Sequence, residues 1–325
     1  MLLKDPIVSI LVTIRDEEKT IGFFIETMAE LVPSLVHNYE IILIDDGSRD
    51  RTVEIATDYA ERDMNLRLIV LSRHYGHEIA VTAGLEQAIG DYVLLIDTAV
   101  VNFPDIIPRL LEKIVGDRLD VVYAADISRT LQSPLRRVFG RFSYGLISHL
   151  TKFEMPVDAS PYRVLNRQTV NALTALKEHN RYLKILYAYV GYRIGSIPFR
   201  FPERSSRVRS GWLATIGRAL DASFSFSTLP LRYMSLMAIS ISGMLMLLAG
   251  YVLVEKFWSD TPIADGWTSL IFIISLLFSV LFFFLALLSE YIGRILIETK
   301  KRPLYYIRQE IGGTQFQIRS IVDRV

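Results

Sequence analysis

Four acidic residues follow short apolar runs early in the chain, where their side chains could contact a polar ligand. If these runs are parallel strands, their carboxyl ends share one edge of a sheet, where open α/β sheets bind ligands. A carboxylate there can accept hydrogen bonds from a nucleobase or a ribose hydroxyl, or hold a divalent ion against a diphosphate. The structural alternative is that these acids cap turns and helices. The residues are Glu17, Asp45, Asp46 and Asp97.

Two basic segments could bind phosphate. Arg204, Arg207 and Arg209 lie just before the most apolar part of the chain and could clamp a diphosphate or a lipid phosphate. They could equally form a patch that only attracts anionic lipid. Arg136 and Arg137 lie among apolar residues, as in an ordinary surface helix or a helix that lies on an anionic membrane surface.

The elements that must position these residues alternate along the chain up to about residue 125. Apolar runs with strand character alternate with stretches of helical spacing, which predicts crossover units and a parallel sheet. The runs are apolar on both faces, so we expect helices to cover both sides. The predicted strands are Val8–Ile14, Glu40–Asp45, Leu66–Ser72, Tyr92–Asp97, Asp120–Ala125 and, later, Tyr192–Phe201. The predicted helices are Ile21–Val32, Asp50–Arg62, His77–Ile89, Pro104–Val115 and residues 166–178.

The composition narrows the classes of function. Apolar residues make up 51% of the 325 residues, more than a soluble domain needs, which indicates a membrane portion. The net charge of +1 gives no field that would attract nucleic acid. The absence of cysteine excludes a disulfide framework, a thiolate nucleophile and a cysteine metal site.

Two long stretches carry no charged side chain. Tyr233–Val254 and Gly266–Ser289 are 22 and 24 residues long, and a spanning helix needs about 20. Buried helices of a soluble core rarely show such runs. Basic residues flank the pair at Arg232 and Arg294, whereas the connecting loop has only Lys256. Because positive charge stays inside, this predicts a membrane hairpin with both chain ends in the cytoplasm.

Taken in order, several motifs resemble the inverting family-two glycosyltransferases with a GT-A domain. More narrowly, they resemble the polyprenyl-phosphate glycosyltransferases, the group of dolichol-phosphate mannose synthase and the bacterial undecaprenyl-phosphate glycosyltransferases. The resemblance covers nearly the whole chain, and its last two motifs are specific to members with two C-terminal spans. The motifs include Asp16-Glu17-Glu18, Asp45-Asp46-Gly47-Ser48, Ser72-Arg73-His74-Tyr75-Gly76 and Glu290-Tyr291-Ile292-Gly293-Arg294.

The resemblance implies roles for residues at the matching positions. Asp97 matches the first acid of a metal-binding Asp-x-Asp motif and is expected to act in catalysis. Arg204 matches an arginine of the segment that closes over the phosphates and is likewise expected to be catalytic. The expected nucleotide-binding residues are Thr13, Glu17, Asp45, Asp46 and Arg73. Phosphate or lipid phosphate is expected at Arg207, Arg209, Arg136 and Arg137.

The chain also departs from the family pattern. The second acid of the metal motif is Ala99, and the acid of the family's Gly-Asp-Phe motif is Pro161. The resemblance implies Mg²⁺ or Mn²⁺, and the loss at Ala99 leaves metal use open: an ion could bind through Asp97 and the diphosphate, or arginines could replace it. A phosphate acceptor, with a second pKa of about 6, is largely a dianion at neutral pH and needs no strong general base.

The function expected is transfer of a sugar from a nucleotide donor, UDP-linked in preference to GDP-linked, to a polyprenyl (undecaprenyl) phosphate. One alternative is a non-catalytic relative that binds nucleotide or serves as a scaffold in glycan assembly, as Ala99 and Pro161 suggest. Another is transfer to a different lipid or to a polysaccharide, but the Gln-x-x-Arg-Trp motif of processive synthases is absent. The resemblance also implies a homo-oligomer.

The expected organisation follows from the motifs and the two spans. We expect a multi-pass protein of the plasma (inner) membrane, because Ile7–Ile14 is too short for a signal peptide and ends in charged residues. The catalytic domain and both termini would be cytoplasmic. The predicted parts are a GT-A domain at 1–212, an amphipathic segment at 213–232, spans at 233–254 and 266–289 around an outer loop at 255–265, and a tail at 290–325.

Overall fold

The computed structural model describes residues 6–102, 104–127, 159–176, 178, 181, 183–201 and 302–313, with scattered positions between 237 and 300. Eight strands form one sheet in the order β7-β5-β6-β4-β1-β2-β3-β8. The central strands β1 to β4 are parallel, as predicted, whereas β6 and β8 run antiparallel to their neighbours. The strands are β1 Val8–Ile14, β2 Tyr39–Asp45, β3 Leu66–Leu71, β4 Tyr92–Ile96, β5 Val121–Asp126, β6 Ala159–Asn166, β7 Ile194–Phe199 and β8 Ile307–Gly312.

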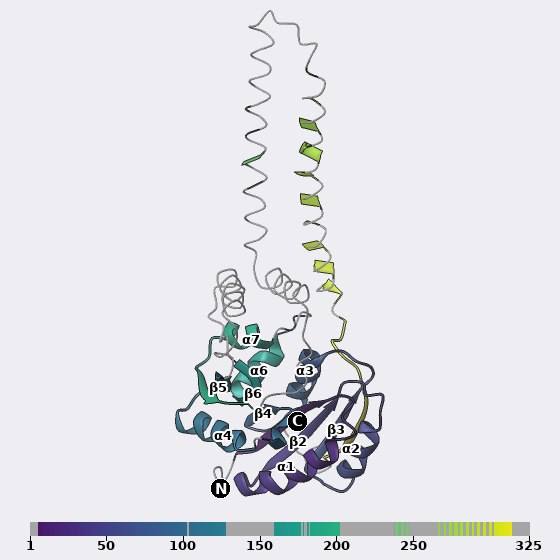
Figure 1. Ribbon diagram of the computed structural model, residues 1–325, viewed down its shortest axis with the longest axis vertical. Coiled ribbons are helices and arrows are strands. Elements are labelled where there is room, and N and C mark those ends of the chain that lie inside the picture. The colour runs from purple at the N-terminus through teal and green to yellow at the C-terminus, as the bar shows by residue number, and fades with distance from the viewer. Residues whose placement is uncertain are drawn as a thin grey trace, which may run out of the picture. The chain divides into compact units, whose positions relative to one another are not determined.

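Helices lie between these strands along the chain and cover the sheet (Figure 1). The prediction of an α/β fold with a mostly parallel sheet is confirmed. The five predicted helices agree with the structure to within a few residues at each end, whereas α7 and a short 3₁₀ helix, η1, were not predicted. The helices are α1 Ile21–Leu35, α2 Thr52–Ala60, α3 His77–Gln87, α4 Ile106–Gly116, α6 Arg167–Ala175 and α7 Leu183–Tyr189, and η1 spans Thr98–Asn102.

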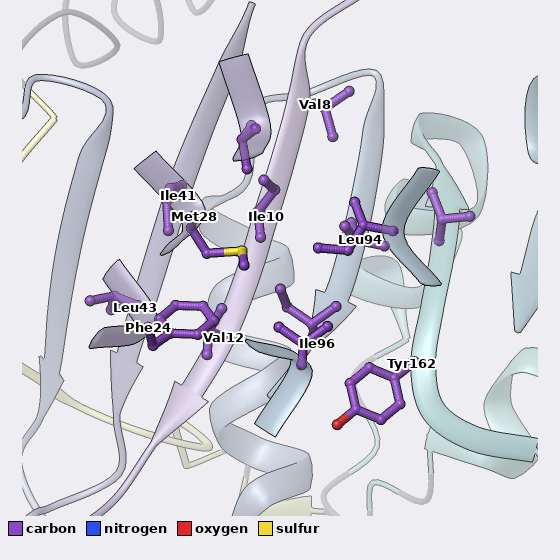
Figure 2. Packing of buried hydrophobic residues seen from close by; sticks show 14 of the residues in the cluster. Val8, Ile10, Val12, Phe24, Met28, Ile41, Leu43, Leu94, Ile96 and Tyr162 are labelled. Atoms are coloured by element: carbon purple, nitrogen blue, oxygen red, sulfur yellow. The ribbon is translucent and has the colours of Figure 1, made fainter. Parts of the chain in front are cut away.

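Alternation along β1 builds the core on both faces of the sheet. Ile10 and Val12 point toward Phe24 and Met28 of α1, and all four side chains are buried (Figure 2). Successive side chains of a strand point to opposite faces. Leu11 therefore packs on the other face, against Gly84 of α3. A Cβ at position 84 would lie 1.9 Å from Leu11 Cδ1, so α3 can approach the sheet this closely only because the residue is glycine.

Two strands are absent from the sequence prediction. In β6, Pro161 and Arg163 interrupt the apolar pattern from which strands are recognised. β8 lies within the predicted tail at 290–325, yet it pairs with β3, so Leu68 lies opposite Ile311. The described residues of 303–325 belong to the same compact unit as the sheet, and those of 210–302 belong to a second unit.

The predicted spans Tyr233–Val254 and Gly266–Ser289 lie largely outside the described residues, and Arg136, Arg137, Arg204, Arg207 and Arg209 lie wholly outside them. Within the part of the chain that is described, no helix has both the length and the apolar character needed to cross a bilayer.

A buried arginine fastens β8 to the sheet. Arg67 of β3 donates from Nη1 to Glu40 Oε2 (3.2 Å) and from Nη2 to Glu310 Oε1 (2.7 Å). Glu40 has no exposed side-chain surface, and its Oε1 also accepts hydrogen bonds from the Ser9 hydroxyl (2.5 Å) and the Ile89 N–H (2.8 Å). This network connects strands β1, β2, β3 and β8 at the opposite end of β2 from Asp45.

Arg67→Met should therefore destabilise the fold strongly. It leaves the Glu40 carboxylate buried without its cation, and breaking a buried pair in this way costs about 3–5 kcal/mol of unfolding free energy. Urea denaturation would measure the loss. Arg51→Met is the control, because Arg51 pairs with Glu54 on the exposed surface of α2, and we expect no measurable change there. Similar midpoints for the two variants would contradict the structural role of Arg67.

Candidate functional site

A cavity of about 580 Å³ opens where β1, β2 and β4 end. It is lined by Thr13, Glu17, Asp46 and Asp97, four of the residues singled out in the sequence. Their common position follows from the parallel alignment of the strands, which pairs Ile14 with Asp45 and places β4 on the other side of β1. The cavity therefore lies at the edge where α/β sheets bind ligands.

Asp46 organises one wall of this cavity. Its buried carboxylate accepts hydrogen bonds from the backbone N–H groups of Tyr75 (2.7 Å) and Gly76 (3.0 Å) and contacts His74 Nδ1 (2.8 Å). His74 Nε2 lies 2.7 Å from Arg15 Nη1. Because a guanidinium can only donate, Nε2 must accept, which assigns the imidazole proton to Nδ1. Asp46 thus fixes the loop after β3 and, through His74, the guanidinium of Arg15 at the cavity.

Asp45 does not line the cavity. Its carboxylate accepts hydrogen bonds from the N–H groups of Gly47 and Ser48 (both 3.1 Å). Burial raises the pKa of Asp45, and the hydrogen bonds from Ser48 and Gly47 partly offset that rise. Gly47 has a φ of 75°, and a Cβ there would lie 2.6 Å from the backbone nitrogen of His74. The structure shows Asp45 as a turn former, and nucleotide binding by Asp45 stays a prediction.

The segment that carries Glu17 is tied to the turn after β2. Asp16 adopts a φ of 52°, its N–H donates to Ser48 Oγ (2.9 Å), and its Oδ1 accepts from the N–H of Arg49 (2.8 Å). The N–H of Glu17 donates to Thr52 Oγ1 (2.7 Å). These bonds hold Glu17 at the cavity and keep the preceding residue, Asp16, in the left-handed backbone conformation that a residue with a side chain rarely adopts.

Asp97 is held by a residue that the sequence analysis did not select. Its Oδ1 accepts hydrogen bonds from the N–H of Ala99 (3.0 Å) and from the hydroxyl of Tyr162. Tyr162 belongs to β6, is buried, and stacks on Phe201 with the ring centroids 5.2 Å apart. Among the described residues, no group of three or more His, Cys, Asp or Glu side chains is arranged to hold a metal ion.

Three other residues of the cavity, His77, Glu78 and Arg163, were not predicted from the sequence. His77 Nδ1 lies 3.0 Å from Oγ1 of the predicted residue Thr13, and Glu78 Oε2 accepts a hydrogen bond from the N–H of Leu183 (3.2 Å). Arg163 lies opposite Leu95 in the β4–β6 pairing and so reaches the same edge as Asp97. The sequence signal that could have identified Arg163 is a charged residue among apolar ones. It was missed because the strand that contains Arg163, β6, was not predicted.

Arg73 lies outside the cavity lining. Its guanidinium carbon lies 4.4 Å from the centroid of the Tyr75 ring, and the side chain is on the exposed part of the loop after β3. The structure therefore brings together four of the six predicted site residues that it describes, and it leaves Asp45 and Arg73 beside the cavity.

Residues 9–174 match the family model described as Glycosyl transferase family 2. The glycosyltransferase YkcC of Bacillus subtilis is 32% identical over 94% of both chains. The bactoprenol glucosyl transferase of Shigella phage SfV is 30% identical over 93% of this chain and 98% of its own. The undecaprenyl-phosphate 4-deoxy-4-formamido-L-arabinose transferase of Pectobacterium atrosepticum is 28% identical over 97% of both chains.

The Asp46–His74–Arg15 contacts predict an effect of Asp46→Asn on the tautomer of His74. The asparagine side chain can present its NH₂ group to Nδ1, which favours moving the imidazole proton to Nε2, where it faces the donor on Arg15. Selective ¹⁵N labelling of histidine would show the Nδ1–H tautomer in the wild type and its loss in Asp46→Asn. Asp117→Asn, at an exposed pair with Lys113, is the control. A wild-type spectrum of the Nε2–H form would refute the assignment.

Proposed function

The chain belongs to glycosyl transferase family 2, and on that premise we propose that it moves a sugar from a nucleotide donor, a UDP-sugar by preference, to a polyprenyl phosphate with inversion at the sugar carbon. The observation that carries the proposal is the cavity at the strand edge, which gathers Thr13, Glu17, Asp46 and Asp97. Carboxylates and a hydroxyl there can accept hydrogen bonds from a base, a ribose and a sugar. Asp45 and Arg73, beside the cavity, remain proposed members of the nucleotide site.

The proposed acceptor rests on two relatives whose names give different transferred sugars. One is named for glucosyl transfer and another for transfer of a formamido-arabinose, yet their names refer to bactoprenol and undecaprenyl phosphate, both polyprenyl lipids. Both match this chain over almost its whole length. We therefore propose an undecaprenyl-type phosphate as acceptor, and the sugar stays open.

A lipid acceptor calls for a membrane, and the topology supports a hairpin. β7 (Ile194–Phe199) and β8 (Ile307–Gly312) belong to one sheet, so the chain leaves this domain and returns to it. A segment that does so can cross a bilayer only an even number of times. Described helical positions in that segment expose large apolar side chains, as a lipid-facing helix would. They include Met244, Leu247, Phe278, Leu281 and Leu288.

We accordingly propose two spans, at 233–254 and 266–289, in the plasma (inner) membrane. The catalytic domain and both termini would lie in the cytoplasm, and the loop 255–265 would lie on the other side. Arg136 and Arg137 are proposed to contact lipid phosphate near the membrane surface. A homo-oligomer belongs to the same proposal, on the family resemblance alone.

The acceptor phosphate itself supplies the nucleophile. At neutral pH it is largely a dianion, so an oxygen lone pair can attack the sugar carbon without a general base. Pro161, which lines the cavity where the family pattern has an acid, is compatible with this reaction. The bond from the sugar to the nucleoside diphosphate breaks as the new bond forms, and the charge on the leaving diphosphate must be stabilised.

The described residues do not form a metal site of their own for that purpose. Oδ1 of Asp97 already accepts two hydrogen bonds, and Ala99 offers no carboxylate. One carboxylate holds Mg²⁺ only when phosphates and water complete its ligands. No step is therefore assigned to an ion, and Mg²⁺ or Mn²⁺ remains a prediction. The diphosphate charge is assigned to Arg204, Arg207 and Arg209 of the phosphate-closing segment.

The reaction can be tested directly. Purified protein incubated with labelled UDP-sugars and undecaprenyl phosphate should yield a labelled lipid that mild acid hydrolyses. Binding of UDP and GDP, measured by calorimetry, separates this proposal from the non-catalytic alternative that Ala99 and Pro161 favour. Nucleotide binding without product from any donor would support the scaffold, and no nucleotide binding at all would refute both.

Asp97→Ala should lower kcat/KM by about 100-fold or more, because a carboxylate that lines the cavity can stabilise the positive charge that develops at the sugar carbon. Because no step is assigned to an ion, we expect the same loss in Mn²⁺ and in EDTA. Asp117→Ala, on the exposed surface, should leave the rate unchanged. Near-normal turnover of the Asp97 variant would show that this residue has no part in the mechanism. A loss of activity seen only in Mn²⁺ would show that Asp97 acts through a bound ion.

A further inference from the structure

Arg163 is a buried cation that has no carboxylate partner among the described residues. Arg163 is 6% exposed and lines the cavity. Its hydrogen bonds go to backbone carbonyls: Nη2 donates to Ser160 O (2.8 Å) and Nε to Pro161 O (3.3 Å). Within the described part of the chain it forms no ion pair. Buried charges in proteins are ordinarily paired, so this guanidinium is arranged to receive an anion from outside the chain.

Tyr187 places a second unmatched polar group beside Arg163. The guanidinium carbon of Arg163 lies 4.4 Å from the centroid of the Tyr187 ring, and both residues line the same cavity. Tyr187 is 5% exposed, and its hydroxyl has no hydrogen-bond partner among the described residues. Burial raises the pKa of Tyr187 to about 12, so the hydroxyl keeps its proton and can donate it in a hydrogen bond.

We propose that Arg163 and Tyr187 form a phosphate subsite in the cavity, in which the guanidinium pairs with the anion and the tyrosine hydroxyl donates to one of its oxygens. A buried donor left without an acceptor is costly, and a charge-assisted hydrogen bond is the strongest way to satisfy it. The proposal rests on the proposed function, which brings phosphate to this cavity twice: in the diphosphate of the donor and in the phosphomonoester of the lipid.

The surrounding groups are compatible with an anion at this place. Glu78 of α3, an acid that lines the same cavity, has one carboxylate oxygen directed to the N–H of Leu183 at the start of α7, the helix that carries Tyr187. The other acids of the cavity accept hydrogen bonds elsewhere: Asp97 from Tyr162, Asp46 from the loop after β3, and Glu17 from the hydroxyl of Thr20. Pro161, two residues before Arg163, adds no charge.

Tyr187→Phe is the most informative variant, because it removes one oxygen that has no hydrogen-bond partner among the described residues and should leave the thermal midpoint unchanged or higher. Binding would be measured by calorimetry on the full-length protein in detergent, with UDP in one arm and farnesyl phosphate, a short polyprenyl phosphate, in the other. We expect affinity for at least one of them to fall about 10- to 100-fold, the effect of one hydrogen bond to a charged group. Arg163→Met should weaken the same ligand by about 10-fold or more, and Arg163→Lys by less.

Matched controls exist in the same domain. Arg109 of α4 makes the same kinds of contact as Arg163, donating to Pro198 O (3.1 Å) and lying over the Phe199 ring, but it does not line the cavity. Tyr59 donates to Glu26 on the surface. Arg109→Met and Tyr59→Phe should therefore bind both ligands normally. Farnesol, which lacks the phosphate, should bind the wild type and Tyr187→Phe equally.

The pattern of losses identifies the source of the phosphate. Weaker farnesyl phosphate binding alone assigns the subsite to the acceptor, and weaker UDP binding alone assigns it to the donor diphosphate. Unchanged affinities for both ligands in Tyr187→Phe and Arg163→Lys would overturn the subsite while leaving the proposed transferase intact. If the wild type binds neither ligand, the proposed function fails and the subsite fails with it.

Discussion

The constraint on which the site depends is the parallel alignment of β1, β2 and β4. Parallel strands end at the same edge, so residues that follow them in sequence meet in space: Thr13 and Glu17 after β1, Asp46 after β2, and Asp97 after β4. No direct contact among these side chains is needed to bring them together. The hydrogen bonds of the sheet set their spacing, and the buried side chains on both faces keep the sheet in place (Figure 2).

Around that edge, carboxylates act first as structural groups. Asp45 closes the turn after β2, and Asp46 fastens the loop after β3 and orients His74 and Arg15. Such fully bonded polar networks are rigid, because each member would be costly to leave unpaired. Rigidity of this kind lets a binding site keep its geometry when the ligand arrives, which lowers the entropy lost on binding.

The far side of the cavity is built differently, from β6 and α7. There the chain lacks the acids expected at positions 99 and 161, and aromatic and basic side chains line the wall instead: Tyr162 holds Asp97, and Arg163 lies over Tyr187. The cavity therefore has one wall of bonded carboxylates. Its other wall has a cation without an ion-pair partner and a hydroxyl without a hydrogen-bond partner among the described residues. A substrate with sugar hydroxyls at one end and phosphate at the other matches that polarity.

The sequence by itself determined the parallel core and the acids at its edge, because strand alternation, turn glycines and caps are local patterns within a few residues. It did not reveal β6, whose Pro161 and Arg163 break the apolar pattern, nor β8, whose exposed residues resemble a tail. Only the tertiary structure joined Tyr162 to Asp97 across 65 residues and Arg67 to Glu310 across 243. Contacts between residues so far apart depend on the packing of the whole sheet, and no spacing along the chain encodes them.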